Sequence, residues 1–204
     1  MEYTNPSSKD KVGLLLFATH CILTTKLRSR IGKLSYPFNF VSRDTWGARA
    51  PAGVSALVRP VPYVVVHHSY IPTACDTKDA CKRNMRLMQD MHQLINGWQD
   101  IGYNFAVGGE GSVYEGRGWE AVGAHAVGYN VRSIGIVMIG DFVASIPPAS
   151  QIQALKDLIA TGVKLGYISP EYKLIGHRQA SATECPGEAL FNEISTWDHF
   201  SPTL

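Results

Sequence analysis

The chain has 204 residues, enough for one folded domain with a sizeable buried core and a short tail. Hydrophobic residues make up 45% and charged residues 18%, which excludes a generally disordered chain. The formal net charge is only +2, and no run of Lys and Arg resembles a phosphate-binding stripe, so no nucleic-acid partner is expected.

The N-terminal segment, residues 1–37, is expected to be a leader outside the folded domain, which then covers residues 38–204. Two lysines precede an apolar run over Val12–Ala18, as in a signal peptide, but His20 interrupts the pattern and no clean cleavage site follows. The run is too short and too broken for a transmembrane segment. We expect either an export signal or the disordered leader of an intracellular form.

The first elements of the domain are a strand and a helix. Val64–His68 is β-branched and predicts a buried strand. Ala80–Ile95 predicts a helix that ends at Asn96–Gly97. Its apolar positions recur at helical spacing and are expected to face the core: Met85, Met88, Met91 and Ile95.

The middle of the domain predicts a hairpin, a central strand and a second helix. Gly108–Gly111 separates two strand-like segments, Tyr103–Val107 and Ser112–Glu115, which indicates a hairpin. Ile134–Ile139 is apolar at nearly every position, as expected of a strand covered on both faces. Gln151–Leu165 is amphipathic and predicts a helix.

The last elements are a short strand over Lys173–Gly176 and a helix over Pro186–Ile194, with Pro186 in its first turn. Together the elements predict a mixed α/β domain in which helices pack on a central, mostly buried β-sheet.

Three side chains of metal-ligand type lie at the ends of these elements: His67, His177 and Cys185. Two imidazoles and a thiolate suit Zn²⁺ and leave a fourth position for water, and a helix N-terminus would favour the thiolate. The same spacing is compatible with a nucleophilic Cys/His pair, or with a core histidine beside an inert thiol. Strand alternation allows one of His67 and His68 to face a metal and does not say which.

Several short motifs, in order along the chain, resemble the peptidoglycan recognition proteins, which are related to phage-type N-acetylmuramoyl-L-alanine amidases. The resemblance covers about Phe40 to Trp197 and is greatest for the insect catalytic branch that dampens immune signalling. The motifs are Val66–Tyr70, Gly102–Phe105, Tyr114–Gly118, Gly123–His125, Ser133–Ile136, Gly176–Gln179 and Thr183–Gly187.

The resemblance implies a central sheet with three main helices and a groove with zinc at its floor. It assigns the zinc ligands to His67, His177 and Cys185. Tyr103 and Thr183 match the residues expected to act beside the metal. Non-catalytic receptors of the family lose the cysteine, so retention of Cys185 and Tyr103 favours an enzyme over a binding module.

Further positions are expected to contact substrate. Gly118 and Trp119 match a pair that favours meso-diaminopimelate over lysine in the stem peptide, with core packing as the alternative for Trp119. Arg132 matches an arginine of diaminopimelate-selective members, and a guanidinium suits the extra carboxylate; a surface charge is the alternative. His68 and His125 are also expected to bind substrate, with structural roles as their alternatives.

The resemblance therefore predicts a zinc-dependent amidase that cleaves the bond between N-acetylmuramic acid and L-alanine and dampens innate immune signalling. Its partners would be bacterial peptidoglycan and muropeptides. We expect a secreted monomer. The resemblance also favours a disulfide between Cys75 and Cys81, which from their spacing alone are either a small ring or two free loop thiols.

Overall fold

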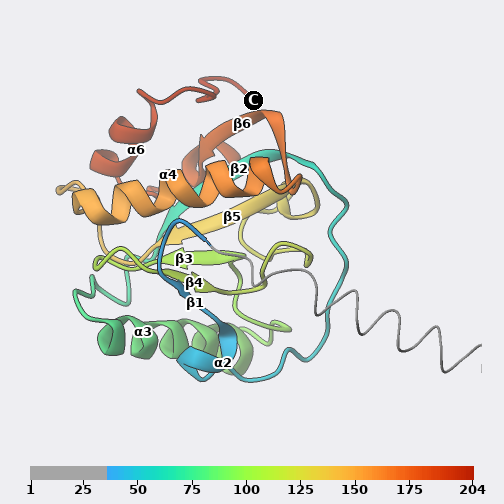
Figure 1. The fold of residues 1–204 in the computed structure, drawn as a ribbon, viewed down its shortest axis with the longest axis vertical. Coiled ribbons are helices and arrows are strands. Elements are labelled where there is room, and N and C mark those ends of the chain that lie inside the picture. The colour runs from blue at the N-terminus through green and yellow to red at the C-terminus, as the bar shows by residue number, and fades with distance from the viewer. Residues whose placement is uncertain (1–35) are drawn as a thin grey trace, which may run out of the picture. The chain divides into compact units, whose positions relative to one another are not determined.

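A mixed β-sheet forms the centre of the structure, a computed structural model that describes residues 36–204 (Figure 1). Most of the predicted leader, residues 1–37, lies outside the described residues. The strands are β1 (Phe40–Val41), β2 (Val61–His68), β3 (Phe105–Val107), β4 (Val113–Glu115), β5 (Ser133–Met138) and β6 (Ile168–Gly176). The helices are α2 (Arg43–Trp46), α3 (Lys78–Asp90), α4 (Ala149–Lys164), α5 (His177–Ala180) and α6 (Glu188–Ile194), with a π-helix over Met91–Ile95 and a 3₁₀ turn over Asn130–Arg132.

The described strands follow the order β1-β4-β3-β5-β2-β6. The predicted hairpin is confirmed, since β3 and β4 pair antiparallel around Gly108–Gly111. The other neighbouring strands run parallel. Each residue of β5 is buried, as its apolar sequence predicts for a strand between two others.

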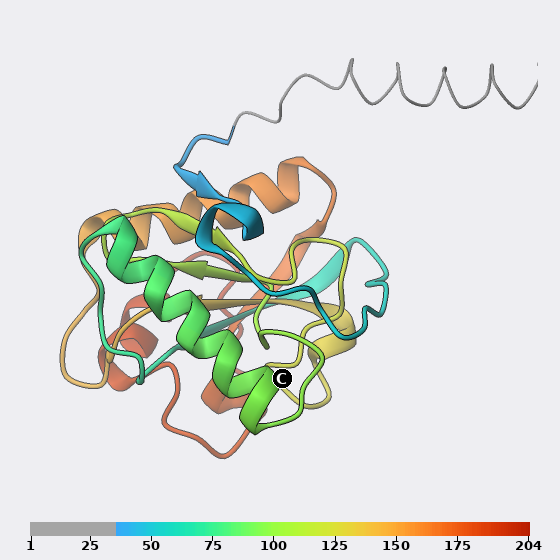
Figure 2. The same cartoon turned by 90° about the horizontal axis from the view of Figure 1, so that it is seen from below.

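Helices cover both faces of the sheet, which confirms the predicted mixed α/β architecture (Figures 1 and 2). On one face, Leu155 and Leu158 of α4 join the cluster that contains Val64 and Val66 of β2. On the other face, α3 packs with Val137 of β5. His67 is paired in register with Val137, so it lies on the face of the sheet on which α3 packs.

The apolar stripe predicted for the helix after Ala80 is confirmed for the first half of its length. Met85 and Met88 are buried, whereas Met91 and Ile95 are 44% and 77% exposed, so the prediction that they belong to the core is wrong. The physical reason is the π-helix that continues α3 from Met91. A π turn contains more residues than an α turn, so it rotates the following side chains away from the stripe. It turns His92 inward instead.

The last helix begins later than predicted. Pro186 precedes the helix, because Gly187 adopts φ +91° and helical structure begins at Glu188. Cys185 consequently lies in the loop between α5 and α6 rather than at a helix terminus, and the expected help from the helix dipole does not apply.

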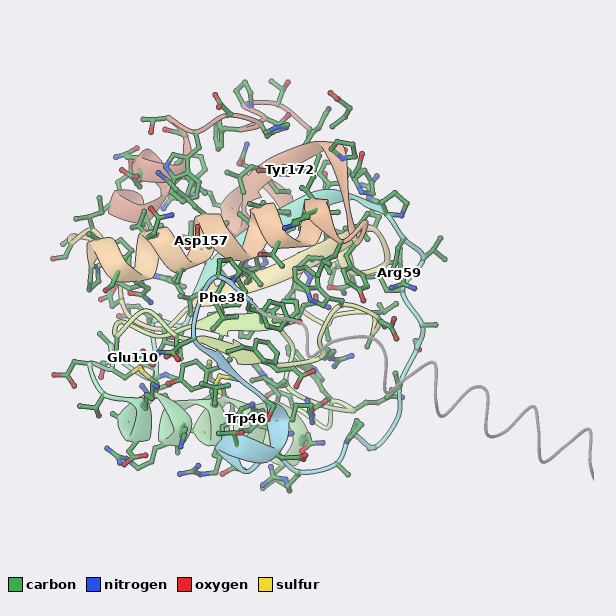
Figure 3. The ribbon with its side chains drawn as sticks, in the orientation of Figure 1. Phe38, Trp46, Arg59, Glu110, Asp157 and Tyr172 are labelled. Carbon is green, nitrogen blue, oxygen red and sulfur yellow. A yellow bond between two sulfur atoms is a disulfide. The ribbon has the colours of Figure 1, made fainter. Side chains whose placement is uncertain are left out.

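The N-terminal part of the domain packs against α3. Trp46 of α2 is fully buried in the cluster that contains Met85 and Met88 of α3 (Figure 3). Its indole Nε1 donates a hydrogen bond to the backbone oxygen of Glu115 at 2.8 Å. Nearby, the predicted disulfide joins Cys75 to Cys81 at the start of α3. No helix within residues 36–204 has both the length and the apolar character needed to span a bilayer.

Candidate metal centre

The structure brings together the three side chains that the sequence singles out as metal ligands. His67 comes from the end of β2, His177 directly follows β6, and Cys185 comes from the loop before α6. Their ligand atoms all lie within 4.8 Å of one another. The rings of His67 and His177 are 4.4 Å apart, and Nδ1 of His67 is 3.7 Å from Sγ of Cys185.

The electrostatics of this cluster suit a bound cation. Burial lowers the pKa of His67 well below its usual value, and the neighbouring His125 and His177 lower it further. Burial likewise lowers the pKa of His177, with His68 contributing. Both imidazoles are therefore neutral near pH 7 and have lone pairs for a metal.

Cys185 is poorly suited to act as a free nucleophile. Burial raises the pKa of its thiol to about 12, although the backbone N–H of His68 donates to Sγ at 3.4 Å. Without a cation the thiol stays protonated, which counts against the Cys/His peptidase alternative. A bound metal ion reverses this preference, because it stabilises the thiolate directly. Two neutral imidazoles and such a thiol fit the donor set of Zn²⁺.

The cluster lies in a pocket of about 450 Å³, which we call the metal pocket. It is lined by His67, His68, Ser69, Tyr70, Trp98, Tyr103, Ala124, His125, Val143, His177, Thr183, Glu184 and Cys185. The volume falls within the usual range for sites that hold a small molecule or part of a polymer.

Tyr103 and Thr183 both lie in this pocket, beside the candidate ligands. The ring of Tyr103 is 5.2 Å from that of His67. Burial raises the pKa of Tyr103, and the nearby Cys185 raises it further, so its hydroxyl remains a hydrogen-bond donor. The hydroxyl of Thr183 accepts a hydrogen bond from the backbone N–H of Cys185 at 3.2 Å.

His68 and His125 also line the metal pocket, but each makes a specific contact within the protein. Nδ1 of His68 accepts a hydrogen bond from the backbone N–H of Phe142 at 3.3 Å. Nδ1 of His125 lies 3.0 Å from Nε2 of His67.

The three residues expected to select the stem peptide lie outside the lining of the metal pocket. Trp119 is 7% exposed and belongs to the core, where its ring contacts Phe105 and stacks on Tyr167. This placement agrees with core packing, the alternative for Trp119, and a substrate contact of Trp119 stays a prediction. Gly118 adopts φ +70°, and its carbonyl accepts a hydrogen bond from the Asn104 side chain.

Arg132 is exposed at the end of the 3₁₀ turn that directly precedes β5. Its guanidinium lies over the rings of Tyr129 and Tyr63, at 4.4 and 5.1 Å. Its Nε donates to the backbone oxygen of Gly128 at 3.1 Å. These contacts hold the guanidinium in one orientation, while its terminal nitrogens make no hydrogen bond within residues 36–204.

Arg178 is a further residue beside the candidate metal centre, and the sequence alone did not indicate it. Its backbone N–H donates to the carbonyl of Cys185 at 2.7 Å, and its Nη2 donates to the carbonyl of Glu184 at 2.6 Å. Nη1 forms an ion pair with Glu188 of α6. The sequence shows Arg178 next to His177, but nothing in the spacing indicates that it fastens the loop that carries Cys185.

Comparison with known proteins places these observations in a family. Residues 57–188 match the family described as N-acetylmuramoyl-L-alanine amidase. Peptidoglycan-recognition protein LB of Drosophila melanogaster is 54% identical over 161 residues, which cover 79% of this chain and 69% of that protein.

Two solved structures of proteins in complex with a ligand are also similar to this chain. A tyrosine mutant of Drosophila PGRP-LB in complex with tracheal cytotoxin has a TM-score of 0.79 and 53% identity, covering 79% of this chain and 96% of that one. Peptidoglycan recognition protein LE in complex with tracheal cytotoxin, a monomeric diaminopimelic acid-type peptidoglycan, has a TM-score of 0.78 and 43% identity. It covers 79% of this chain and 95% of its own.

Proposed function

Since the chain belongs to the peptidoglycan recognition protein family and has its N-acetylmuramoyl-L-alanine amidase domain, we propose that it is a zinc-dependent enzyme that hydrolyses bacterial peptidoglycan. The scissile bond is the amide between the lactyl group of N-acetylmuramic acid and L-alanine. One observation carries the proposal: His67, His177 and Cys185 meet at a pocket that also contains Tyr103. A receptor that binds without cutting has no need of this donor set.

In the proposed mechanism, His67, His177 and Cys185 hold the ion, and the other pocket residues act on the substrate. Bound Zn²⁺ supplies Lewis-acid polarisation of the scissile carbonyl and acidifies a water molecule. Tyr103 donates a hydrogen bond to the carbonyl oxygen as that oxygen gains negative charge, and its raised pKa keeps the donor protonated. Thr183 accepts the N–H of Cys185 and so stabilises the loop that carries this ligand.

The decisive experiment follows the release of stem peptides from purified diaminopimelate-type peptidoglycan. We expect release by the zinc-loaded chain, loss of release on chelation, and recovery when zinc is returned. Cys185→Ser should abolish release while muropeptide binding persists, because it removes one ligand and leaves the rest of the pocket. Binding without release by the zinc-loaded parent would identify a non-catalytic receptor instead. Full activity of Cys185→Ser would contradict the metal centre.

The proposed substrate contains meso-diaminopimelate, and Arg132 recognises its additional carboxylate. The similar structures with tracheal cytotoxin support this substrate class. The oriented guanidinium of Arg132, with its terminal nitrogens free of protein partners within residues 36–204, supports the contact.

Arg132→Ala should lower the ratio of diaminopimelate to lysine muropeptide hydrolysis about tenfold, the value of one charge-assisted contact. Arg59→Ala, another exposed arginine over a tyrosine ring, is the matched control, and an unchanged ratio in Arg132→Ala would exclude the contact.

The setting proposed for this activity is extracellular. The disulfide between Cys75 and Cys81 supports exposure to an oxidising compartment. Removal of muropeptides there would dampen innate immune signalling. We expect the chain to act as a monomer, and its mass in solution, measured by light scattering with and without muropeptide, tests this directly.

A further inference from the structure

A second histidine lies behind His67, on the side away from Cys185. Nδ1 of His67 faces Cys185, while its Nε2 lies 3.0 Å from Nδ1 of His125. The two rings are nearly perpendicular, at 84°. His67 therefore has one ring nitrogen directed at the candidate metal site and the other within hydrogen-bonding distance of a buried partner.

A chain of hydrogen bonds runs from His125 through Ser133 to the backbone carbonyl of Tyr129. Because a carbonyl can only accept, the donor and acceptor of each bond in this chain are fixed. The Ser133 hydroxyl lies 2.8 Å from the carbonyl oxygen of Tyr129, which only accepts, so Ser133 donates its hydrogen there. The same Ser133 oxygen is 3.4 Å from Nε2 of His125 and is left to accept.

This direction determines which ring nitrogens carry hydrogen. A neutral His125 that donates from Nε2 has its lone pair on Nδ1. That lone pair accepts the hydrogen of His67 Nε2. The Nδ1 of His67 is then unprotonated and faces the candidate metal site, as a zinc ligand requires.

The position of the His125 ring is itself built into the fold. A Cβ atom added at Gly123 or at Gly135 would overlap the His125 ring, so both positions leave room for it. Gly135 lies in β5, paired with Val65 of β2, two residues before His67. The backbone at His125 is also fixed, since its N–H donates to Oδ1 of Asn130 at 2.8 Å.

We propose that His125 is a positioning residue, which accepts a hydrogen bond from Nε2 of His67 and so holds His67 in the tautomer that presents Nδ1 to zinc. This inference rests on the proposed zinc centre. It gives His125 a role distinct from the substrate contact expected from sequence. Hydrogen-bond partners of this kind behind a ligand histidine typically contribute about 10- to 100-fold to metal affinity.

The first test uses the unaltered protein. Nitrogen NMR of the metal-free chain, with labelled imidazole rings, reports which nitrogen of each histidine is protonated. We expect the hydrogen on Nε2 in both His67 and His125. A hydrogen on Nδ1 of His125 would overturn the proposal, because His125 would then be unable to accept from His67.

The second test measures zinc affinity by competition with a chromophoric chelator, which does not depend on catalysis. His125→Phe keeps an aromatic ring and removes the acceptor, and should weaken binding about 10- to 100-fold. His125→Asn, whose amide oxygen lies near the position of Nδ1, should recover most of the loss. Ser133→Ala should weaken binding severalfold, because His125 loses the acceptor for its Nε2 hydrogen.

The exposed His199 supplies the matched control, and His199→Phe should bind zinc as the parent does. Circular dichroism of each metal-free variant establishes that it is folded. If His125→Phe does not fold, the Ser133→Ala variant and the NMR measurement test the role of His125 instead. Parental zinc affinity in folded His125→Phe would overturn the role of His125 alone. Absence of zinc binding by the parent would contradict the metal centre itself, so the two failures are distinguishable.

Discussion

The hydroxyl of Tyr103 is placed to donate a hydrogen bond inside the metal pocket. Tyr103→Phe keeps the ring and removes the donor, so we expect turnover to fall about 10²- to 10³-fold, the usual cost of one donor to a developing oxyanion. Zinc affinity should not change, since Tyr103 is not among the candidate ligands. Steady-state hydrolysis of a diaminopimelate muropeptide measures the effect.

Tyr172→Phe is the control for this substitution, because Tyr172 lies in β6 outside the lining of the metal pocket (Figure 3). A Tyr103→Phe variant with at least half of the parental turnover would remove Tyr103 from the mechanism.

His92 makes the stability of the fold depend on pH. It is 9% exposed, stacks on Trp98 and accepts a hydrogen bond from the N–H of Gly102 at 3.0 Å. Burial lowers the pKa of His92 to about 4, with the charge of Arg117 contributing. An unfolded histidine titrates near 6.5, so between these values the unfolded chain binds a proton that the folded chain does not. His92 therefore contributes stability above pH 6.5 that is lost as the pH falls toward 4, about 3 kcal/mol in all.

His92→Asn tests this contribution, because an amide near the position of Nδ1 retains an acceptor and does not titrate. Urea unfolding of the metal-free variant at pH 7 and pH 5 should show a smaller loss of stability on acidification than in the parent, by up to about 1.4 kcal/mol per pH unit. The exposed His199→Asn should lose as much stability as the parent. Equal losses in His92→Asn and the parent would show that another group dominates.

The loop between α5 and α6 depends on Arg178 for its position. Arg178 contacts both Glu184 and Cys185 and pairs with Glu188, while its guanidinium lies over the Phe191 ring at 4.8 Å. Arg178→Lys retains the charge and loses the planar donor geometry, so we expect zinc affinity to fall about tenfold and the free energy of unfolding to fall by about 1–2 kcal/mol.

Arg59 provides a matched comparison for Arg178. It pairs with Glu120, lies over the Tyr167 ring at 4.7 Å and is not among the residues that line the metal pocket. Arg59→Lys should leave zinc affinity at the parental value. Similar zinc affinities in the two lysine variants, measured by chelator competition, would contradict a specific role for Arg178.

The elements that the sequence predicts well are those with a strong local pattern. Val64–Val66 of β2 and most of β5 are apolar and buried, as in strands with both faces covered, and α4 is regularly amphipathic. The π turn at Met91 and the late beginning of α6 were missed, since each depends on a local backbone change rather than on apolar spacing.

The residues of the candidate site were predictable where short motifs contain them, but the contacts between these residues were not. Motif resemblance indicates the candidate ligands and Tyr103, which the structure brings together. The contact of His125 with His67 joins residues 58 positions apart and leaves no pattern in the sequence. Trp119 shows the converse: its motif predicts a substrate contact, which stays a prediction, whereas its burial against Phe105 becomes visible only in the packed core.

At the scale of the whole molecule, zinc should stabilise the fold as well as complete the site. A ligand that binds the folded chain at 100 times its dissociation constant contributes about 2.7 kcal/mol. For a domain of this size we expect the midpoint of thermal unfolding to rise by about 5–10 °C. Differential scanning calorimetry with and without zinc measures the shift. Cys185→Ser should show little of it, and an equal shift in that variant would indicate that zinc binds elsewhere.

The separation of the three ligands along the chain has a consequence for biosynthesis. His67 is made with β2, whereas His177 and Cys185 follow β6. A nascent chain therefore has one candidate ligand until β6 is complete, a second once His177 is made, and all three only after Cys185. The proposed zinc centre can therefore be completed only after almost all of the described domain has been synthesised.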